Sequence, residues 1–255
     1  MKSPIVMIGV GEMGGVFARG LLRAGHPLFP VARDTALADA ARESADPGGV
    51  LVAVGEGDLQ AVLAEMPAAW RERLILLQNE LLPHDWQRHG IESPTVISVW
   101  FEKKPGMDFK VIVPSPVHGP RAGLVRSALA TLGIPSREVD EGRMLFELVL
   151  KNVYILTSNI AGLRVGGTVG ELWSGHQDFA RAVADEVMAI QFRLIGRELD
   201  REALIAGMVE AFEGDLQHRC TGRSAPARLS RAIEHADAAG LAVPVLRELW
   251  DAQLV

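Results

Sequence analysis

Three glycines near the start of the chain have the spacing of a dinucleotide-binding loop. They form a G-x-G-x-x-G pattern that directly follows a short apolar run and opens a helical pattern. In such a loop the first glycine permits the tight turn, the second lets the backbone approach a pyrophosphate, and the third allows close packing of helix on strand. The helix N-terminus then offers N–H groups and a positive dipole end to the phosphates. We therefore expect this loop to bind a dinucleotide, with a plain tight turn as the alternative. The loop consists of Gly9, Val10, Gly11, Glu12, Met13 and Gly14.

Two charged residues, Arg33 and Asp34, stand where the second expected strand ends. An arginine at this position pairs with the 2′-phosphate of NADP, whereas an acid binds the ribose hydroxyls of NAD. Asp34 lies 20 residues after Gly14, which favours NAD, but counting from Gly25 and His26 puts Arg33 at the strand tip. We favour NADP, with NAD as the alternative.

A lysine lies in the middle of the most apolar helical segment of the chain. Lys151 is flanked by apolar residues, and Asn159 follows eight residues later, about 80° round the helix and so near one face. Glu147, one turn back, could pair with the lysine. Burial of an ammonium costs several kcal/mol unless the charge is paired or used. Two interpretations stay open: an ion pair with Glu147, or an acid that polarises and protonates a carbonyl.

These residues must be positioned by strands and helices that alternate along the first third of the chain. Such alternation is typical of βαβ units and predicts a mostly parallel sheet of the Rossmann type. We expect strands at 4–8, 28–32, 50–54, 74–77, 96–101 and 111–113. We expect helices at 13–22, 35–44, 58–65 and 83–89.

The pattern changes after residue 113. A turn-rich connector with Pro114, Pro116 and Pro120 is expected first, followed by helices almost to the end. We therefore predict a dinucleotide-binding domain over 1–120 and an all-helical domain over 121–255 that binds the substrate. The helices are expected at 121–132, 143–165, 176–198, 201–212, 225–239 and 244–253.

The sheet is expected to lack one edge strand. Only 17 residues separate Arg33 from Leu51, too few for the further strand of a full doubly wound sheet. Pro30 lies inside the second expected strand, and proline is tolerated at a sheet edge because no neighbour there needs its missing N–H. The second strand is therefore predicted to be an edge.

Composition narrows the class of protein. The chain has 255 residues, 48% of them hydrophobic, and a formal net charge of −6, which does not favour nucleic-acid binding. A single cysteine, Cys220, indicates a reducing compartment, so we expect a cytoplasmic protein. The seven histidines are scattered, and we predict no metal site. No clean apolar stretch of membrane-spanning length is present, so no membrane association is expected. A homodimer is compatible with the sequence.

Motifs spread over most of the chain resemble ketopantoate reductase (2-dehydropantoate 2-reductase), a family of the 6-phosphogluconate-dehydrogenase-like group. The order and spacing of the motifs carry the resemblance, since none is decisive alone. Besides the glycine loop and the stretch ending at Arg33, they are Leu76-Leu77-Gln78-Asn79, His118-Gly119-Pro120, the pair Lys151 and Asn159, Gly170-Glu171-Leu172 and Gly240-Leu241-Ala242-Val243-Pro244.

The resemblance implies an NADPH-dependent reductase that transfers a hydride to the carbonyl of a small 2-keto acid. Lys151 would hydrogen-bond the carbonyl oxygen and donate the proton. Asn79 and Asn159 would orient cofactor and substrate. Two alternatives remain: a relative that binds the nucleotide without turnover and has a regulatory role, and an imine reductase of the same superfamily.

This chain departs from the family at several positions. Ile155 replaces a second asparagine four residues after the lysine, and Glu80 replaces the glycine after Asn79. A bulkier or less polar carbonyl substrate fits Ile155 better than ketopantoate. The family's C-terminal serine and glutamate have no clear equivalent. A run of arginines could receive a substrate carboxylate in their place, or could form a solvated face: Arg219, Arg223, Arg228 and Arg231.

Overall fold

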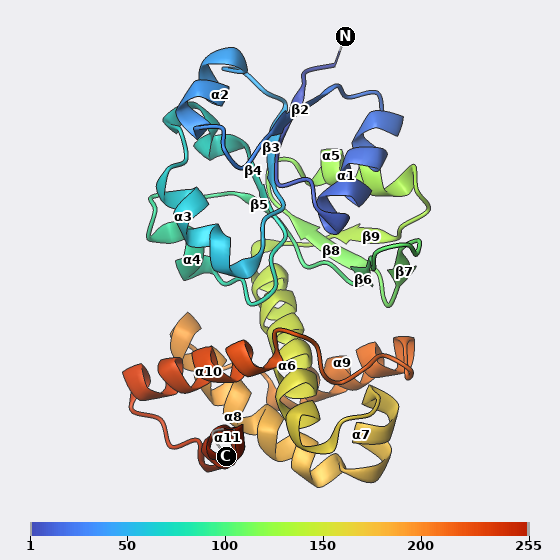
Figure 1. Cartoon of the computed structure of the whole chain (residues 1–255), viewed down its shortest axis with the longest axis vertical. Helices are drawn as coiled ribbons and strands as arrows, with labels where there is room; N and C mark the ends of the chain where they lie inside the picture. The colour runs from blue at the N-terminus through green and yellow to red at the C-terminus, as the bar shows by residue number, and fades with distance from the viewer. Residues whose placement is uncertain (1, 254–255) are drawn as a thin grey trace. The chain divides into compact units, whose positions relative to one another are not determined.

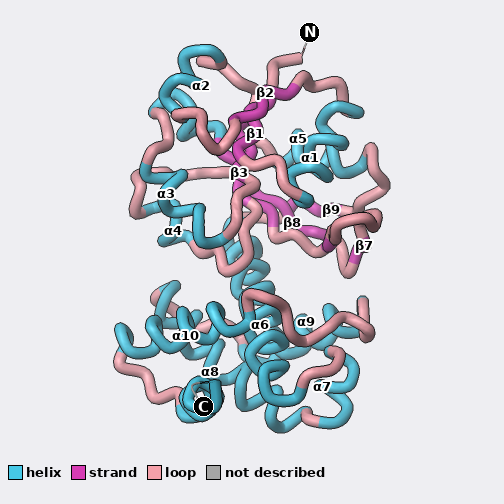
Figure 2. The backbone as a smooth tube through the Cα atoms, in the orientation of Figure 1, coloured by secondary structure: helices cyan, strands magenta, loops and turns pink. Residues whose placement is uncertain are grey.

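The computed structural model describes residues 2–253. The chain divides into two compact units, Met1–Glu147 and Leu148–Val255, each with its own architecture. The first unit is an α/β sandwich, and the second consists of helices (Figures 1 and 2).

The first unit contains nine strands and the helices that cover them. The strands are β1 (Ile5–Ile8), β2 (Leu28–Val31), β3 (Gly49–Val52), β4 (Leu74–Leu76), β5 (Thr95–Ile97), β6 (Phe101–Glu102), β7 (Lys110–Val111), β8 (Ser115–His118) and β9 (Ser136–Glu138). The helices are α1 (Glu12–Arg23), α2 (Leu37–Glu43), α3 (Leu59–Ala64), α4 (Pro83–Gln87) and α5 (Ala122–Ala130), with short 3₁₀ turns at Glu56–Asp58 and Ala68–Arg73.

Seven of these strands form one sheet in the order β2-β1-β3-β4-β5-β8-β9. All neighbours are parallel except β5 and β8. Ile5 of β1 is in register with Leu28 of β2 on one side and with Gly49 of β3 on the other. Since β1 to β4 run in the same direction, the loops that follow them lie together at the carboxyl ends of these strands.

The position of β2 confirms the predicted loss of a flanking strand. This strand pairs only with β1 and forms one end of the sheet. Pro30 is in register with Met7 on that single paired side. Its missing N–H therefore costs the sheet no hydrogen bond on the open side.

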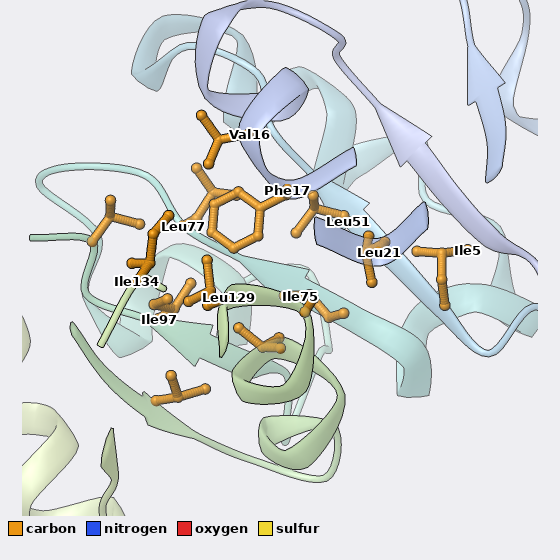
Figure 3. Close-up of a cluster of buried hydrophobic side chains, with 14 of the residues drawn as sticks. Ile5, Val16, Phe17, Leu21, Leu51, Ile75, Leu77, Ile97, Leu129 and Ile134 are labelled. Carbon is orange, nitrogen blue, oxygen red and sulfur yellow. The ribbon is translucent and has the colours of Figure 1, made fainter. Parts of the chain in front are cut away.

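A continuous apolar core holds α1 and α5 against one face of the sheet, as Figure 3 shows. Phe17 of α1 is almost fully buried among Leu51, Ile75 and Leu77 of the sheet region. Alternate strand residues face opposite sides, so the other face is available to α2, α3 and α4, which Figure 1 shows on the opposite side of the sheet. Burial of a side chain such as Phe17 contributes about 1.5–3 kcal/mol to the free energy of folding.

Two short strands, β8 and β9, lie within residues 114–140, where the sequence predicted no strand. The expected connector contains β8, in which the carbonyl oxygen of Pro116 accepts a hydrogen bond from Ser98 N–H at 3.1 Å. The helix α5 and the short edge strand β9 complete the sheet unit. The division of the chain thus falls after Glu147, later than the boundary expected at residue 120.

The strands β6 and β7 form a separate antiparallel hairpin. Phe101 is in register with Val111, and Glu102 with Lys110. The strand expected over 96–101 is therefore two strands, because the chain leaves the main sheet after Ile97 and re-forms in the hairpin.

Helices make up the second unit, and α6 (Glu141–Val165) enters it from the first. The helix α8 contacts α7, α9, α10 and α11 and so lies at the centre of the unit. The short helix α7 had no counterpart among the expected elements. By length and composition α6 could cross a membrane, but 78% of its most apolar window is buried inside the protein, which accounts for that composition. The further helices are α7 (Val169–Gly175), α8 (Gln177–Ile195), α9 (Arg201–Gly214), α10 (Ala225–Ala239) and α11 (Pro244–Gln253).

Candidate functional site

The glycine loop connects β1 to α1, and steric contacts require two of its three glycines. Gly9 has φ +91°, and a Cβ there would lie 2.7 Å from the carbonyl oxygen of Ala53. A Cβ on Gly14 would lie 2.5 Å from the carbonyl oxygen of Gly9. Gly11 is different, because a Cβ would meet nothing within 4 Å. Its open side is the side from which a pyrophosphate would approach.

The N-terminus of α1 presents groups that favour an anion. Gly11 is the N-cap residue, and no side chain caps the helix there. The first N–H groups of a helix lack partners within the helix, and its dipole favours negative charge. A surface depression of about 340 Å³ lies along this turn, and exposed Val10 and Gly11 contribute to its lining. The geometry fits the phosphates of a dinucleotide.

Residues that follow β2 and β4 lie, like the glycine loop, at the carboxyl ends of the parallel strands. Arg33 and Asp34 are exposed just beyond the end of β2. Asn79 is half-buried and follows β4. The structure therefore brings together on the first unit all three elements that the sequence assigned to the cofactor: the glycine loop, Arg33 and Asn79.

The turn before Asn79 is held by a buried glutamine. Gln78 donates from Nε2 to the carbonyl oxygens of Val52, at 2.7 Å, and Val54, at 3.3 Å. Its Oε1 accepts from the N–H of Leu77 at 3.1 Å. One amide thus joins the ends of β3 and β4 and restrains the segment that carries Asn79.

Glu80, which stands where the motif has glycine, adopts a backbone conformation that favours glycine. It has φ +60°, the one positive φ of a non-glycine residue among the described residues. The left-handed region costs a residue with a Cβ roughly 1–2 kcal/mol. Backbone strain of this kind gathers at functional sites, where surrounding structure maintains it.

In the second unit, Lys151, Ile155 and Asn159 follow one another on one face of α6 at intervals of four residues. Lys151 is only 9% exposed, and its Nζ lies 5.3 Å from the ring centroid of Tyr154. Ile155 is the one residue of 151–160 that is not buried. This face combines a cationic donor, an apolar contact and an amide.

Glu147, the carboxylate expected one turn before Lys151, lies in an arginine cluster of the first unit. It is 2% exposed, and its Oε1 accepts from Arg137 at 2.6 Å and from Arg143 at 2.7 Å. Two guanidinium groups therefore balance the charge of this buried carboxylate.

Asn159 is oriented by an arginine of the run near the C-terminus. Arg228 is buried, and its Nη1 donates to Asn159 Oδ1 at 2.7 Å. A guanidinium can only donate, so the amide oxygen must face it. The amide nitrogen is then left for an acceptor, with Ser158 Oγ a weak partner at 3.4 Å. Arg219 and Arg223 are exposed and Arg231 is half-buried, so a burial pattern that the sequence did not reveal separates Arg228 from the run.

Two of the motifs that carry the family resemblance have structural roles. In Gly170-Glu171-Leu172, the Glu171 carboxylate accepts from Thr168 N–H at 2.8 Å, and Thr168 Oγ1 accepts from Glu171 N–H at 3.2 Å. This capping box begins α7. Gly240, with φ +63°, ends α10. These motifs define helix ends in the second unit.

The segment around Cys220 packs tightly on α6 beyond Asn159. A Cβ on Gly162 would lie 2.6 Å from the Cβ of Cys220. Burial raises the pKa of the Cys220 thiol to about 11, and the Glu171 carboxylate adds to the effect. The thiol therefore stays protonated at neutral pH and acts as a packing group.

Comparison with known proteins identifies the fold. No family model matches the chain, and no curated protein sequence does. Among solved structures, a ketopantoate reductase of Ralstonia eutropha superposes with a TM-score of 0.69 at 19% identity, covering 98% of this chain and 96% of that one. A D-mandelate dehydrogenase with NADH and anilino(oxo)acetate gives 0.67 at 12% identity, covering 97% and 96%. A dimeric ketopantoate reductase of Staphylococcus aureus gives 0.61 at 14% identity, covering 97% and 96%.

The fold of these reductases therefore extends along almost the whole chain. The resemblance to ketopantoate reductases expected from the motifs is confirmed at the level of fold. The predicted fold class, a mostly parallel sheet followed by helices, is confirmed as well.

Proposed function

We propose that the protein is an NADPH-dependent reductase that transfers a hydride from the nicotinamide to the carbonyl carbon of a small 2-keto acid. The observation that carries this proposal is the buried lysine of α6, Lys151, on one helix face with Asn159. The fold is one that ketopantoate reductases and a D-mandelate dehydrogenase use.

The first unit would hold the cofactor. The turn at Gly9 and the open side of Gly11 leave room for phosphates at the start of α1. Arg33 would contact the 2′-phosphate of NADP by charge-assisted hydrogen bonds. Asn79, restrained through Gln78, would orient the nicotinamide end. The D-mandelate dehydrogenase of the same fold was solved with NADH, so NAD is the alternative that a binding measurement must separate.

The second unit would supply the acid and orient the substrate. Lys151 would hydrogen-bond the carbonyl oxygen, stabilise the negative charge that develops on it and donate a proton. The Asn159 amide nitrogen would donate to a substrate oxygen, because Arg228 occupies the amide oxygen. Donors on both sides fit a substrate rich in acceptor oxygens, as a 2-keto acid is.

Ile155 favours a substrate less polar than ketopantoate. It lies between Lys151 and Asn159 on the helix and offers an apolar contact where the family has an asparagine. A hydroxyl placed against it would lose its hydrogen bonds to water without gaining a partner, which costs about 1–3 kcal/mol. We therefore propose a 2-keto acid with an apolar group next to the carbonyl.

The test is calorimetric binding of NADPH and NADH, followed by NADPH oxidation with a panel of 2-keto acids. The panel pairs apolar side chains with hydroxylated ones of similar size. We expect NADPH binding and faster turnover with the apolar members. Binding without turnover on any member would favour the non-catalytic relative, and turnover only with imines would favour the imine reductase. Absence of binding of both dinucleotides would exclude the proposed function.

We further propose a cytoplasmic homodimer. The single cysteine of the chain is compatible with a reducing compartment. A ketopantoate reductase of the same fold is a dimer. Sedimentation of the pure protein tests the oligomeric state.

A further inference from the structure

The hairpin of β6 and β7 is tied to α1 beside the glycine loop by two ion pairs. Lys103, directly after β6, has its Nζ 3.0 Å from Oε2 of Glu12, the first residue of α1. Arg19, two turns along the helix, donates to Asp108 at 3.1 Å, and its guanidinium lies 5.3 Å from the ring centroid of Phe109. The N–H of Phe109 and the Arg19 guanidinium lower the pKa of Asp108, so both contacts favour its carboxylate form.

The Lys103 ammonium is restrained and only partly solvated. Its side chain is 19% exposed, and Nζ also donates to the carbonyl oxygen of Lys104 at 2.8 Å. An ammonium has three donors, so one remains after these two bonds. Lys103 lines the same depression as Gly11, the glycine whose open side faces the space for a ligand.

Glu12 occupies a position that an incoming anion would compete for. A carboxylate in the first helical turn is stabilised by the helix dipole, typically by about 0.3–1 kcal/mol. The same dipole attracts a pyrophosphate, and two anions this close to one another repel. Without a cation between them, the Glu12 carboxylate would oppose binding of a dinucleotide at this loop.

We propose, on the premise of the function proposed above, that Lys103 is a further residue of the dinucleotide site and binds the pyrophosphate. In the free protein Glu12 holds its ammonium at the edge of the depression. When the pyrophosphate arrives, Lys103 bridges it to Glu12 and so offsets the repulsion. The hairpin, anchored through Arg19, Asp108 and Phe109, positions the ammonium.

The test measures the Kd of NADPH by calorimetry for the unmodified protein and three variants. Lys103→Met should raise the Kd about tenfold or more, since a charge-assisted bond to phosphate is lost and Glu12 is left unopposed. Glu12→Gln should lower the Kd several-fold, because the competing charge is removed. The matched control is Lys104→Met: Lys104 pairs with Glu102 on the same hairpin, is more exposed and does not line the depression. Its Kd should be unchanged.

Three readouts separate a binding role from a structural one. The thermal midpoint of each variant shows whether it is folded, and Lys103→Gln replaces Lys103→Met if the latter unfolds. The difference between the unmodified protein and the Lys103 variant should shrink as salt is raised, because screening weakens charge contacts. If a folded Lys103 variant binds NADPH with an unchanged Kd, or if Glu12→Gln binds NADPH more weakly, the inferred role of Lys103 is wrong. Neither result contradicts the proposed function. Failure of the unmodified protein to bind NADPH or NADH instead overturns the proposed function and this inference with it.

Discussion

The glycine loop of the first unit and the lysine face of the second present different chemical groups. The loop offers backbone: Gly9 and Gly14 are required because main-chain atoms lie within 2.7 Å and 2.5 Å of where a Cβ would be. The face of α6 offers side chains, the ammonium of Lys151 and the amide of Asn159. The main-chain groups of the loop keep their positions as long as the fold is kept. The side-chain groups on α6 can be altered by single substitutions.

The departures from the family follow this difference. The glycine loop keeps its full pattern, and even Glu80 keeps a left-handed backbone where the motif has glycine. On α6, Ile155 stands where the ketopantoate reductase motif has an asparagine, and Arg228 of α10 donates to Asn159. The glycine loop is thus under steric constraint, whereas the lysine face of α6 differs from the motif at Ile155.

The largest effect on activity is expected from substitution of Lys151 on the face of α6. Lys151→Ala should lower kcat about 10²–10⁴-fold, the usual contribution of a positioned acid, while the Kd of NADPH stays the same. Steady-state rates and calorimetry on the same preparation measure both. Lys104→Ala, on the exposed hairpin, is the control. An unchanged rate would remove Lys151 from the mechanism.

Substitution of glycines in the backbone site separates folding from binding. Gly9→Ala should destabilise the protein by about 2–4 kcal/mol, from left-handed strain plus overpacking. Gly11→Ala should leave stability nearly unchanged, since its added Cβ meets nothing within 4 Å, yet weaken NADPH binding. Urea unfolding and calorimetry give the two quantities. Equal loss of stability in both variants would contradict the distinction between a packed and an open glycine.

Substitution of Arg33 tests whether a single side chain beside the glycine loop sets the preference for NADPH over NADH. Arg33→Ala should raise the Kd of NADPH about 10–100-fold by loss of charge-assisted bonds, and leave the Kd of NADH nearly unchanged. Paired titrations with the two dinucleotides measure the ratio. If both affinities fall equally, the assignment to NADP is wrong and Asp34 becomes the residue to test.

The smallest effect is expected at Glu80. Glu80→Gly should raise the free energy of unfolding by up to about 1 kcal/mol, because relief of left-handed strain outweighs the added freedom of the unfolded chain. Glu80→Ala is the matched control, since alanine meets the same conflict and should bring no such gain. A loss of stability in the glycine variant would show that contacts of the Glu80 side chain outweigh its backbone strain.

Local patterns were sufficient to predict much of the first unit. The G-x-G-x-x-G turn, the alternation of strands and helices and the edge position of β2 all follow from patterns within short stretches of the sequence. Lys151 and Asn159 share a helix face for the same reason, since the helical period is a local property. The strands β8 and β9 were not predicted because prolines and charged residues in this stretch are typical of loops. Pairing of β8 with β5, and of β9 with β8, makes them strands.

The sequence by itself determined the turn chemistry at Gly9, the edge role of the strand that carries Pro30, and the lysine on an apolar helix. Only the tertiary structure decided which arginine of the C-terminal run is buried against Asn159, and which lysine of the hairpin meets Glu12. It also decided that the sheet unit extends to Glu147. The physical reason is range: helical periodicity and the backbone freedom of glycine and proline are properties of short stretches of sequence. The contacts of Arg228 with Asn159 and of Lys103 with Glu12 join segments tens of residues apart and exist only after the chain has folded.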